Sequence, residues 1–192
     1  MKKETAEIFY PANQQEWRQW LEENHCVKEA VWMVMYKKGS DKPSISWSDA
    51  VDAALCYGWI DSVKRSVDSE SSIQFFTKRK PKSGWSKINK AKIDRLTENG
   101  LMKPAGQACI ETAKQNGSWT ILDEVEELTM PDDLKAALDT QTEAVAYFSG
   151  LSKSVKKAML QWVMFAKRPE TRQNRINEIV TLAALKQKPK QF

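Results

Sequence analysis

Histidine is nearly absent from this chain of 192 residues, with His25 as its one example, and cysteine is scarce. The three cysteines are Cys26, Cys56 and Cys109, and no two of them form a Cys-x-x-Cys pair. This pattern favours neither a zinc site nor a disulfide framework, so we expect no bound metal and no cofactor. A Ser-His-Asp or Cys-His catalytic arrangement would have to use His25. Because the side chain of the adjacent Cys26 should diverge from it, we expect His25 to lie at a helix C-terminus instead.

Long apolar runs and glycine-rich loops are also missing. No run approaches the roughly 20 apolar residues that cross a membrane. Neither Gly-x-Gly-x-x-Gly nor Gly-x-x-x-x-Gly-Lys is present, which leaves nucleotide-loop chemistry unsupported. The first residues carry two lysines with no apolar stretch behind them, so we expect no secretory signal and a cytoplasmic protein. With 41% hydrophobic and 29% charged residues, the composition is that of a globular chain with a core.

Charge is abundant and unevenly distributed along the chain. Residues 78–103 hold nine basic and two acidic residues, and residues 153–190 hold ten basic and two acidic residues. Between them, residues 123–143 hold eight acidic residues and one lysine. A basic block can mark an anionic partner such as phosphate, nucleic acid or a lipid surface. The alternative is that the basic blocks are solvated helix faces, which the acidic block partly neutralises within the fold.

Apolar spacing and capping residues predict the first secondary-structure elements. A helix is expected over 13–24, because an asparagine cap is followed by apolar residues on one helical face. The segment 29–38 is apolar on both faces, which is typical of a central buried strand. A second helix should begin at Ser46 and end at Gly58.

A hairpin is expected next in the chain. Residues 59–67 and 72–80 have the composition of strands and are separated by a polar turn. The loop length leaves two registers open, which place either Lys78 or Arg79 opposite Asp61. Because opposite residues share a face of the sheet, both registers predict a basic partner for Asp61.

The remaining sequence is predicted to be helical, beginning with a helix capped by Ser86. The whole pattern predicts a mostly helical α+β protein. Residues 1–117 should form an α+β domain, a small antiparallel three-stranded sheet covered by helices, with the hairpin near 59–80. Residues 118–130 are expected to be an acidic linker, and residues 131–192 an all-helical unit.

Three segments together resemble a known family. The first comprises residues 16–21, 31–32 and 36–38, the second residues 54–62, 76–81, 85–86 and 89, and the third residues 166–172. The second begins with ALCYGWIDS. Their order is similar to that of the YdeI/OmpD-associated proteins, also called bacteriocin-protection proteins, over nearly the whole chain. The resemblance implies a soluble bacterial stress or antimicrobial-peptide protection factor, and it carries over no catalytic residues.

The middle of the chain holds the strongest candidate ligand site. Arg79 and Lys80 precede the expected cap Ser86, and free N–H groups at a helix start beside two cations can hold a phosphate or carboxylate. We therefore predict that the protein binds a small anionic or phosphorylated ligand. The residues expected to bind it lie on the hairpin, its exit turn and the helix start, and are Arg65, Arg79, Lys80, Ser83, Trp85, Ser86 and Asn89. The alternative is architectural, with Trp85 packed in the core and Ser86 acting only as a cap.

Asp61 is the candidate catalytic residue. A buried carboxyl group can act as a general acid or base, and together with Arg79 it would make the protein an enzyme that acts on the same anionic ligand. No second carboxylate lies nearby in the sequence, so a two-carboxylate mechanism is not indicated. An ion-paired Asp61 is the expected state. The sequence leaves catalysis open.

A second basic cluster surrounds a proline that interrupts the helical pattern. It consists of Lys167, Arg168, Arg172 and Arg175. These side chains could hold nucleic-acid phosphates without sequence specificity, although the chain has no helix-turn-helix or zinc-finger motif. The alternative is a corner between two helices, in which the arginines cap helix ends. Non-specific nucleic-acid binding and a protein partner therefore stand as alternatives to a small anion.

Overall fold

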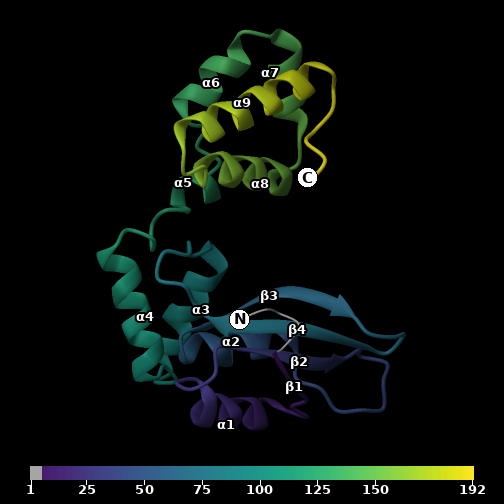
Figure 1. Ribbon diagram of the computed structural model, residues 1–192, viewed down its shortest axis with the longest axis vertical. Helices are drawn as coiled ribbons and strands as arrows, with labels where there is room; N and C mark the ends of the chain where they lie inside the picture. The colour runs from purple at the N-terminus through teal and green to yellow at the C-terminus, as the bar shows by residue number, and fades with distance from the viewer. Residues whose placement is uncertain (1–5) are drawn as a thin grey trace. The chain divides into compact units, whose positions relative to one another are not determined.

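The computed structural model describes residues 6–192. The lysine-bearing start of the chain, on which the expectation about a secretory signal depends, lies outside these residues. The chain divides after Thr120 into two compact units, and each has its own hydrophobic core. Figure 1 shows a sheet with helices in the first unit and helices in the second, so the predicted α+β class is confirmed.

The described sheet has four strands and is mixed. The strands are β1 Glu7–Phe9, β2 Ala30–Tyr36, β3 Trp59–Ser66 and β4 Ser71–Lys78. Their order is β1-β2-β4-β3, with β1 parallel to β2 and the other neighbours antiparallel. The prediction of three antiparallel strands is therefore wrong, because the sheet has a fourth strand, β1, which runs parallel to its neighbour. β1 pairs over three residues only, which is too short for an alternation to be recognised in the sequence.

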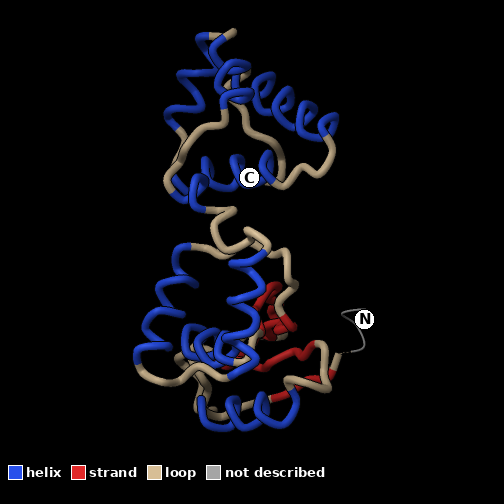
Figure 2. Tube along the Cα trace, turned by 90° about the vertical axis from the view of Figure 1, so that its left-hand side faces the viewer, coloured by secondary structure: helices blue, strands red, loops and turns tan. Residues whose placement is uncertain are grey.

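Four helices share a core with this sheet. They are α1 Gln14–Asn24, α2 Trp47–Cys56, α3 Lys87–Glu98 and α4 Pro104–Gln115. Figure 2 shows them in blue beside the red strands. The side chains of Asn13, Ser46 and Ser86 accept hydrogen bonds from backbone N–H groups in the first turns of α1, α2 and α3. These three predicted caps are confirmed, because capping depends on residues close together in the sequence.

The central strand β2 buries both of its faces. Val31, Met33 and Met35 belong to the main core, which also contains the apolar sides of α1 and α2. Ala30 and Trp32 belong to a smaller cluster with Phe75. Successive side chains of a strand point to opposite faces, so this alternation places the small cluster on the other face of the sheet.

The hairpin formed by β3 and β4 has neither of the two expected registers. Phe76, not a basic residue, lies opposite Asp61, and Ser66 lies opposite Ser72. The turn lies one residue earlier than expected, between Ser66 and Ser71, and the Asp68 carboxylate accepts hydrogen bonds from two backbone N–H groups within it. A register shift between Asp61 and Lys64 then moves the pairing by one more residue. The predicted basic partner across the strand from Asp61 is therefore wrong.

The second unit is a bundle of five described helices. They are α5 Asp123–Glu126, α6 Asp132–Asp139, α7 Thr142–Gly150, α8 Lys153–Met164 and α9 Pro169–Ala184. Leu134, Met159 and Ile176 lie in its core. The segment 118–130, for which the sequence predicts a linker, contains α5, and Val125 of this helix is buried in the same core.

Candidate functional site

Arg79 follows β4 directly, and a glycine fixes its position. The backbone N–H of Arg79 donates to the carbonyl oxygen of Gly58, 2.9 Å away. Gly58 has a φ of 74°, a left-handed conformation that suits glycine, and it lies between α2 and β3. A Cβ atom at this glycine would lie 3.1 Å from the carbonyl oxygen of Ala105 and 3.4 Å from Cβ of Cys109. The close approach therefore brings the start of β3, and Arg79 with it, against α4.

The guanidinium group of Arg79 is buried with most of its hydrogen-bonding capacity unused. The residue is only 8% exposed, and its Nε and Nη1 atoms have no hydrogen-bond partner among residues 6–192. Nη2 donates to the carbonyl oxygen of Gly84, and the guanidinium carbon lies 3.6 Å from the centre of the Trp85 ring. Desolvation lowers the pKa of Arg79 to about 10, against smaller opposing effects of Cys109 and Asp61. Arg79 is therefore a buried cation that lacks a direct anionic partner in the described chain.

A cavity of about 430 Å³ lies beside this arginine. This volume is in the range of small-molecule binding sites. Its wall is formed by the corner after α1, the end of α2, the strands β3 and β4, and the exposed side of α4. The lining residues are His25, Cys26, Tyr57, Gly58, Trp59, Lys78, Arg79, Pro81, Ala105, Ala108, Cys109 and Thr112.

Lys78 is the second cation of the cavity wall, and its charge is already paired. Its Nζ atom lies 2.7 Å from Oε1 of Glu29 and donates to the carbonyl oxygen of Cys26 at 2.9 Å. Arg79 makes no such ion pair within the described residues. An anion in this cavity would therefore be attracted mainly by Arg79.

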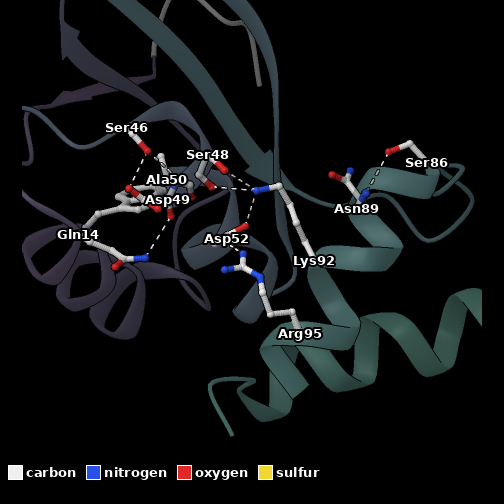
Figure 3. Close-up of polar contacts among 11 residues, drawn as sticks. Gln14, Ser46, Ser48, Asp49, Ala50, Asp52, Ser86, Asn89, Lys92 and Arg95 are labelled. Atoms are coloured by element: carbon white, nitrogen blue, oxygen red, sulfur yellow. Dashed lines mark hydrogen bonds and ion pairs between the residues drawn. The ribbon is translucent and has the colours of Figure 1, made fainter. Parts of the chain in front are cut away.

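The structure brings two of the predicted ligand-binding residues into contact, Arg79 and Trp85. Lys80 is exposed, and the hydroxyl group of Ser83 donates to its carbonyl oxygen at 2.8 Å. Ser86 caps α3 by accepting from the backbone N–H of Asn89 at 3.3 Å, as Figure 3 shows. The lining of the described cavity includes Arg79 but none of the five other predicted residues at the exit turn and helix start: Lys80, Ser83, Trp85, Ser86 and Asn89.

Arg65 and Asp61 lie away from this cavity. Arg65 is exposed, and its guanidinium carbon is 4.8 Å from the centre of the Trp32 ring, on the sheet face of the smaller cluster. Oδ2 of Asp61 accepts hydrogen bonds from Nε1 of Trp47 at 2.9 Å and from Nε2 of Gln74 at 3.1 Å. The Asp61 carboxylate is thus held by two neutral donors, and it does not line the cavity that Arg79 lines.

His25 and Cys26 line the cavity, although no sequence pattern placed them there. Their side chains were expected to diverge, and this expectation is wrong. The Sγ atom of Cys26 lies 3.2 Å from Nε2 of His25. The two residues form the corner that follows α1, where His25 keeps helical backbone angles, with φ −59° and ψ −28°, and the backbone N–H of Lys28 donates to the carbonyl oxygen of Asn24. For α4 the sequence did hold a signal, since Ala105, Ala108 and Cys109 share one face of the predicted helix.

Part of the first basic block pairs with acid inside the fold. Asp52 of α2 is 4% exposed, and Nζ of Lys92 lies 2.6 Å from its Oδ1 atom. Nη2 of Arg95 pairs with the other oxygen of the same carboxylate. Lys92 also donates to the Ser48 hydroxyl at 2.8 Å, and Figure 3 shows these contacts between α2 and α3. Two cations of the block therefore join helices, and their partner is an acid of α2 rather than of the acidic block at residues 123–143.

The second basic cluster forms a corner between helices. Nε and Nη2 of Arg172 lie 2.6 and 2.9 Å from the two carboxylate oxygens of Asp133. This pair holds the pKa of Asp133 below its ordinary value, and Arg172 also donates to the carbonyl oxygen of Val163. Arg175 donates to the carbonyl oxygen of Trp162, near the end of α8. Lys167 and Arg168, also predicted here, are exposed.

Residues 6–192 contain no group of three or more histidine, cysteine, aspartate or glutamate side chains arranged to hold a metal ion. Within the same residues, every helix is too short or too polar to span a membrane.

Two family models match the chain. Residues 9–109 match the family described as a domain of unknown function, DUF8412. Residues 127–186 match the family described as "Bacteriocin-protection, YdeI or OmpD-Associated". The resemblance inferred from the sequence is therefore confirmed for the C-terminal part, whereas the segment ALCYGWIDS falls within the other match. No curated protein and no solved structure matches the chain.

Proposed function

The chain belongs to the DUF8412 family, and we propose that its first unit is a binding module for a small anionic ligand, carboxylate or phosphate, in the Arg79 cavity. The observation that carries the proposal is the buried guanidinium with Nε and Nη1 unpartnered among the described residues. A buried unpaired charge lowers the stability of a fold by several kcal/mol. An anion that reaches these donors would offset that loss.

Several features make Arg79 suited to this role. Its ring partner Trp85 is almost fully buried and holds the guanidinium plane in place. Burial strengthens the attraction of Arg79 for an anion, because the local dielectric constant is lower than that of water. The neighbouring Lys80 is exposed, so its contribution would be weak and screened by salt. The proposal therefore assigns most of the binding to one arginine.

Binding is favoured over catalysis and over nucleic-acid recognition. Asp61, the residue considered for acid–base chemistry, is outside the Arg79 cavity and accepts hydrogen bonds from two neutral donors. Arg172 and Arg175, considered for phosphate contacts, already donate to groups of the second unit. These contacts support a small ligand rather than a nucleic acid as the partner of the protein.

The C-terminal match gives the proposed binding a biological setting. The matched family is described by bacteriocin protection, and residues 127–186 correspond to it. We extend that description to this chain as a proposal: a bacterial stress or antimicrobial-peptide protection factor whose first unit binds a small anion. The cytoplasm remains the compartment expected from the sequence.

A thermal-shift screen of the full chain tests the proposed binding. The ligands are nucleotides, sugar phosphates, small carboxylates and short DNA or RNA, and the proteins are wild type, Arg79→Met and Lys80→Met. A small anion present at 100 times its dissociation constant should stabilise the wild type by about 2.7 kcal/mol. Arg79→Met should abolish the ligand-induced shift, and Lys80→Met, which removes an adjacent exposed cation, should keep most of it.

Three results would contradict the proposal. One is a stabilising anion whose effect survives Arg79→Met, which would locate the site elsewhere. Another is stabilisation by nucleic acid alone with a steep loss at higher salt, which would favour the basic blocks. A screen in which every small anion leaves the melting temperature unchanged would also overturn it.

A further inference from the structure

Cys26 and His25 form a thiol–imidazole pair at the wall of the Arg79 cavity. The Sγ atom of Cys26 lies 3.2 Å from Nε2 of His25, within hydrogen-bond distance for sulfur. Cys26 is exposed, whereas Cys56 is fully buried and Cys109 is intermediate. Cys26 is therefore the cysteine of the described chain that a reagent in solution can reach most easily.

The orientation of the imidazole suits it to accept the thiol proton. The Nδ1 atom of His25 lies 2.8 Å from the carbonyl oxygen of Leu21. A carbonyl oxygen only accepts hydrogen bonds, so this contact assigns the proton of the neutral ring to Nδ1. Nε2 then has a free lone pair directed at Cys26. A thiol beside such a base is activated as a nucleophile.

Long-range contacts hold the corner that carries the pair. Lys78 of β4 donates to the carbonyl oxygen of Cys26 at 2.9 Å. The indole N–H of Trp59 donates to the carbonyl oxygen of His25 at 3.4 Å. Within the corner, the backbone N–H of Lys28 donates to the carbonyl oxygen of Asn24 at 2.8 Å. The thiol and imidazole are thus positioned by the fold and by the strand that leads to Arg79.

We propose that Cys26 is a redox-modification site, at which His25 activates the thiol for exchange with a small disulfide that bears carboxylates. This inference rests on the proposed function for the choice of an anionic partner, because His25, Cys26 and Arg79 line the same cavity. Arg79 is more than nine-tenths buried and has two unpartnered nitrogen atoms among the described residues. It would attract the carboxylate while the sulfur atoms of the ligand approach Cys26.

The exchange step balances without any other reactant. The Cys26 thiol loses its proton to Nε2 of His25, and its sulfur attacks one sulfur of the disulfide. A new disulfide bond forms between Cys26 and half of the ligand as the original sulfur–sulfur bond breaks. The leaving thiolate then takes the proton from His25. Cys26 is oxidised and the ligand is reduced, and one small thiol is released.

Two disulfide reagents separate the activation of the thiol from the recognition of charge. Dithiodipyridine carries no carboxylate, whereas dithiobis(nitrobenzoate) carries two. The rates of both reagents are measured at one pH with wild type, His25→Asn and Arg79→Met, and the modified cysteine is identified by mass spectrometry. His25→Asn keeps a side-chain N–H that can donate to Leu21 but has no counterpart of Nε2. His25→Gln is a second variant in case His25→Asn fails to fold, as judged by circular dichroism.

The neutral reagent should modify Cys26 of the wild type about tenfold faster, or more, than Cys26 of His25→Asn. Arg79→Met should lower the ratio of anionic to neutral rates. Equal neutral rates in wild type and the His25 variants would overturn the activation by His25, as would modification found first at Cys109. A ratio of anionic to neutral rates that Arg79→Met leaves unchanged would overturn the anionic partner, and with it the proposed function. A difference in neutral rate between wild type and the His25 variants would in that case still support the activation of Cys26 by His25.

Discussion

The guanidinium carbon of Arg79 lies 3.6 Å from the centre of the Trp85 ring, while the next residue in the chain, Lys80, is exposed. Two adjacent cations thus have opposite environments. Burial removes water from the guanidinium group of Arg79, and this desolvation lowers its pKa to about 10. This contrast leads to a direct expectation about stability.

Replacing Arg79 by methionine should raise the free energy of unfolding of the ligand-free protein by about 1 kcal/mol or more. A buried charge without an anionic partner is unfavourable, and an apolar side chain of similar length can pack on Trp85 without that loss. Urea denaturation at low ionic strength measures the change. Arg65→Met, at an exposed arginine of the same hairpin, serves as the control and should change stability by less than about 0.5 kcal/mol.

A loss of stability in Arg79→Met would contradict this expectation. It would mean that the hydrogen bond from Arg79 to Gly84, together with the cation–ring contact, outweighs the burial of the charge. The argument for an anion at this residue would then lose its energetic basis.

Asp52 should be far more important for stability than its partner Arg95. Asp52→Ala leaves the Lys92 ammonium, whose side chain is 12% exposed, without its carboxylate and should lower the free energy of unfolding by about 3–5 kcal/mol. The Arg95 side chain is 56% exposed, so Arg95→Ala should cost less than about 1 kcal/mol. Urea denaturation of both variants measures the two free energies of unfolding. A loss for Asp52→Ala as small as the loss for Arg95→Ala would show that Lys92 finds another partner.

Gly106 should not tolerate even a methyl group. A Cβ atom at this position would lie 2.3 Å from the carbonyl oxygen of Cys56, so α4 and α2 would have to separate. We expect Gly106→Ala to lower the free energy of unfolding by about 2 kcal/mol or more, against a gain in helix propensity of about 1 kcal/mol. Gly39→Ala is the matched control, because nothing lies within 4 Å of its Cβ position. Thermal unfolding should separate the two variants clearly, and similar melting temperatures would refute the close approach.

The pair formed by Asp133 and Arg172 should make the second unit sensitive to acid. Arg172 lowers the pKa of Asp133 from its ordinary value of 3.8, so the folded state binds its proton more weakly than the unfolded state. The stabilisation is therefore complete above pH 3.8 and is lost as the pH falls through the lowered pKa. Calorimetry between about pH 5 and about pH 2 should show a smaller acid-induced loss for Asp133→Asn than for wild type.

Asp132→Asn is the control for this pH dependence. Asp132 adjoins Asp133 but makes no ion pair within the described residues, so its replacement should leave the acid-induced loss close to that of wild type. Parallel curves for Asp133→Asn and wild type would show that the ion pair does not couple proton binding to folding.

Much of the helical structure was predictable because its signals are local. Asn13, Ser46 and Ser86 each cap a helix through a backbone group three residues away. The hairpin was less predictable. Its register depends on the tight turn at Asp68 and on a shift after Asp61, and a shift of one residue changes every facing pair. The short strand β1 was missed because three residues carry too little pattern.

The candidate site was also predictable only in part. The sequence singled out Arg79, which lines the cavity, and Trp85, which packs on it, but it grouped them with Lys80 and the cap Ser86, which do neither. It also treated His25 and Cys26 as divergent neighbours. That rule is only a tendency: His25 keeps helical backbone angles at the end of α1, and its Nε2 atom still lies 3.2 Å from Sγ of Cys26. No local signal distinguishes such a corner from an ordinary helix end.

The amino-acid sequence by itself determined the α+β class, the helix starts and the apolar faces, because each depends on residues within a few turns of one another. It also determined that the cationic pair Arg79 and Lys80 stands at the end of the hairpin segment. Only the tertiary structure decided that Arg79 is buried and Lys80 exposed, and that α4, β4 and the corner at Cys26 meet around one cavity. These outcomes depend on strand register and on the approach of α4 to Gly58, which are set by packing between segments far apart in the chain.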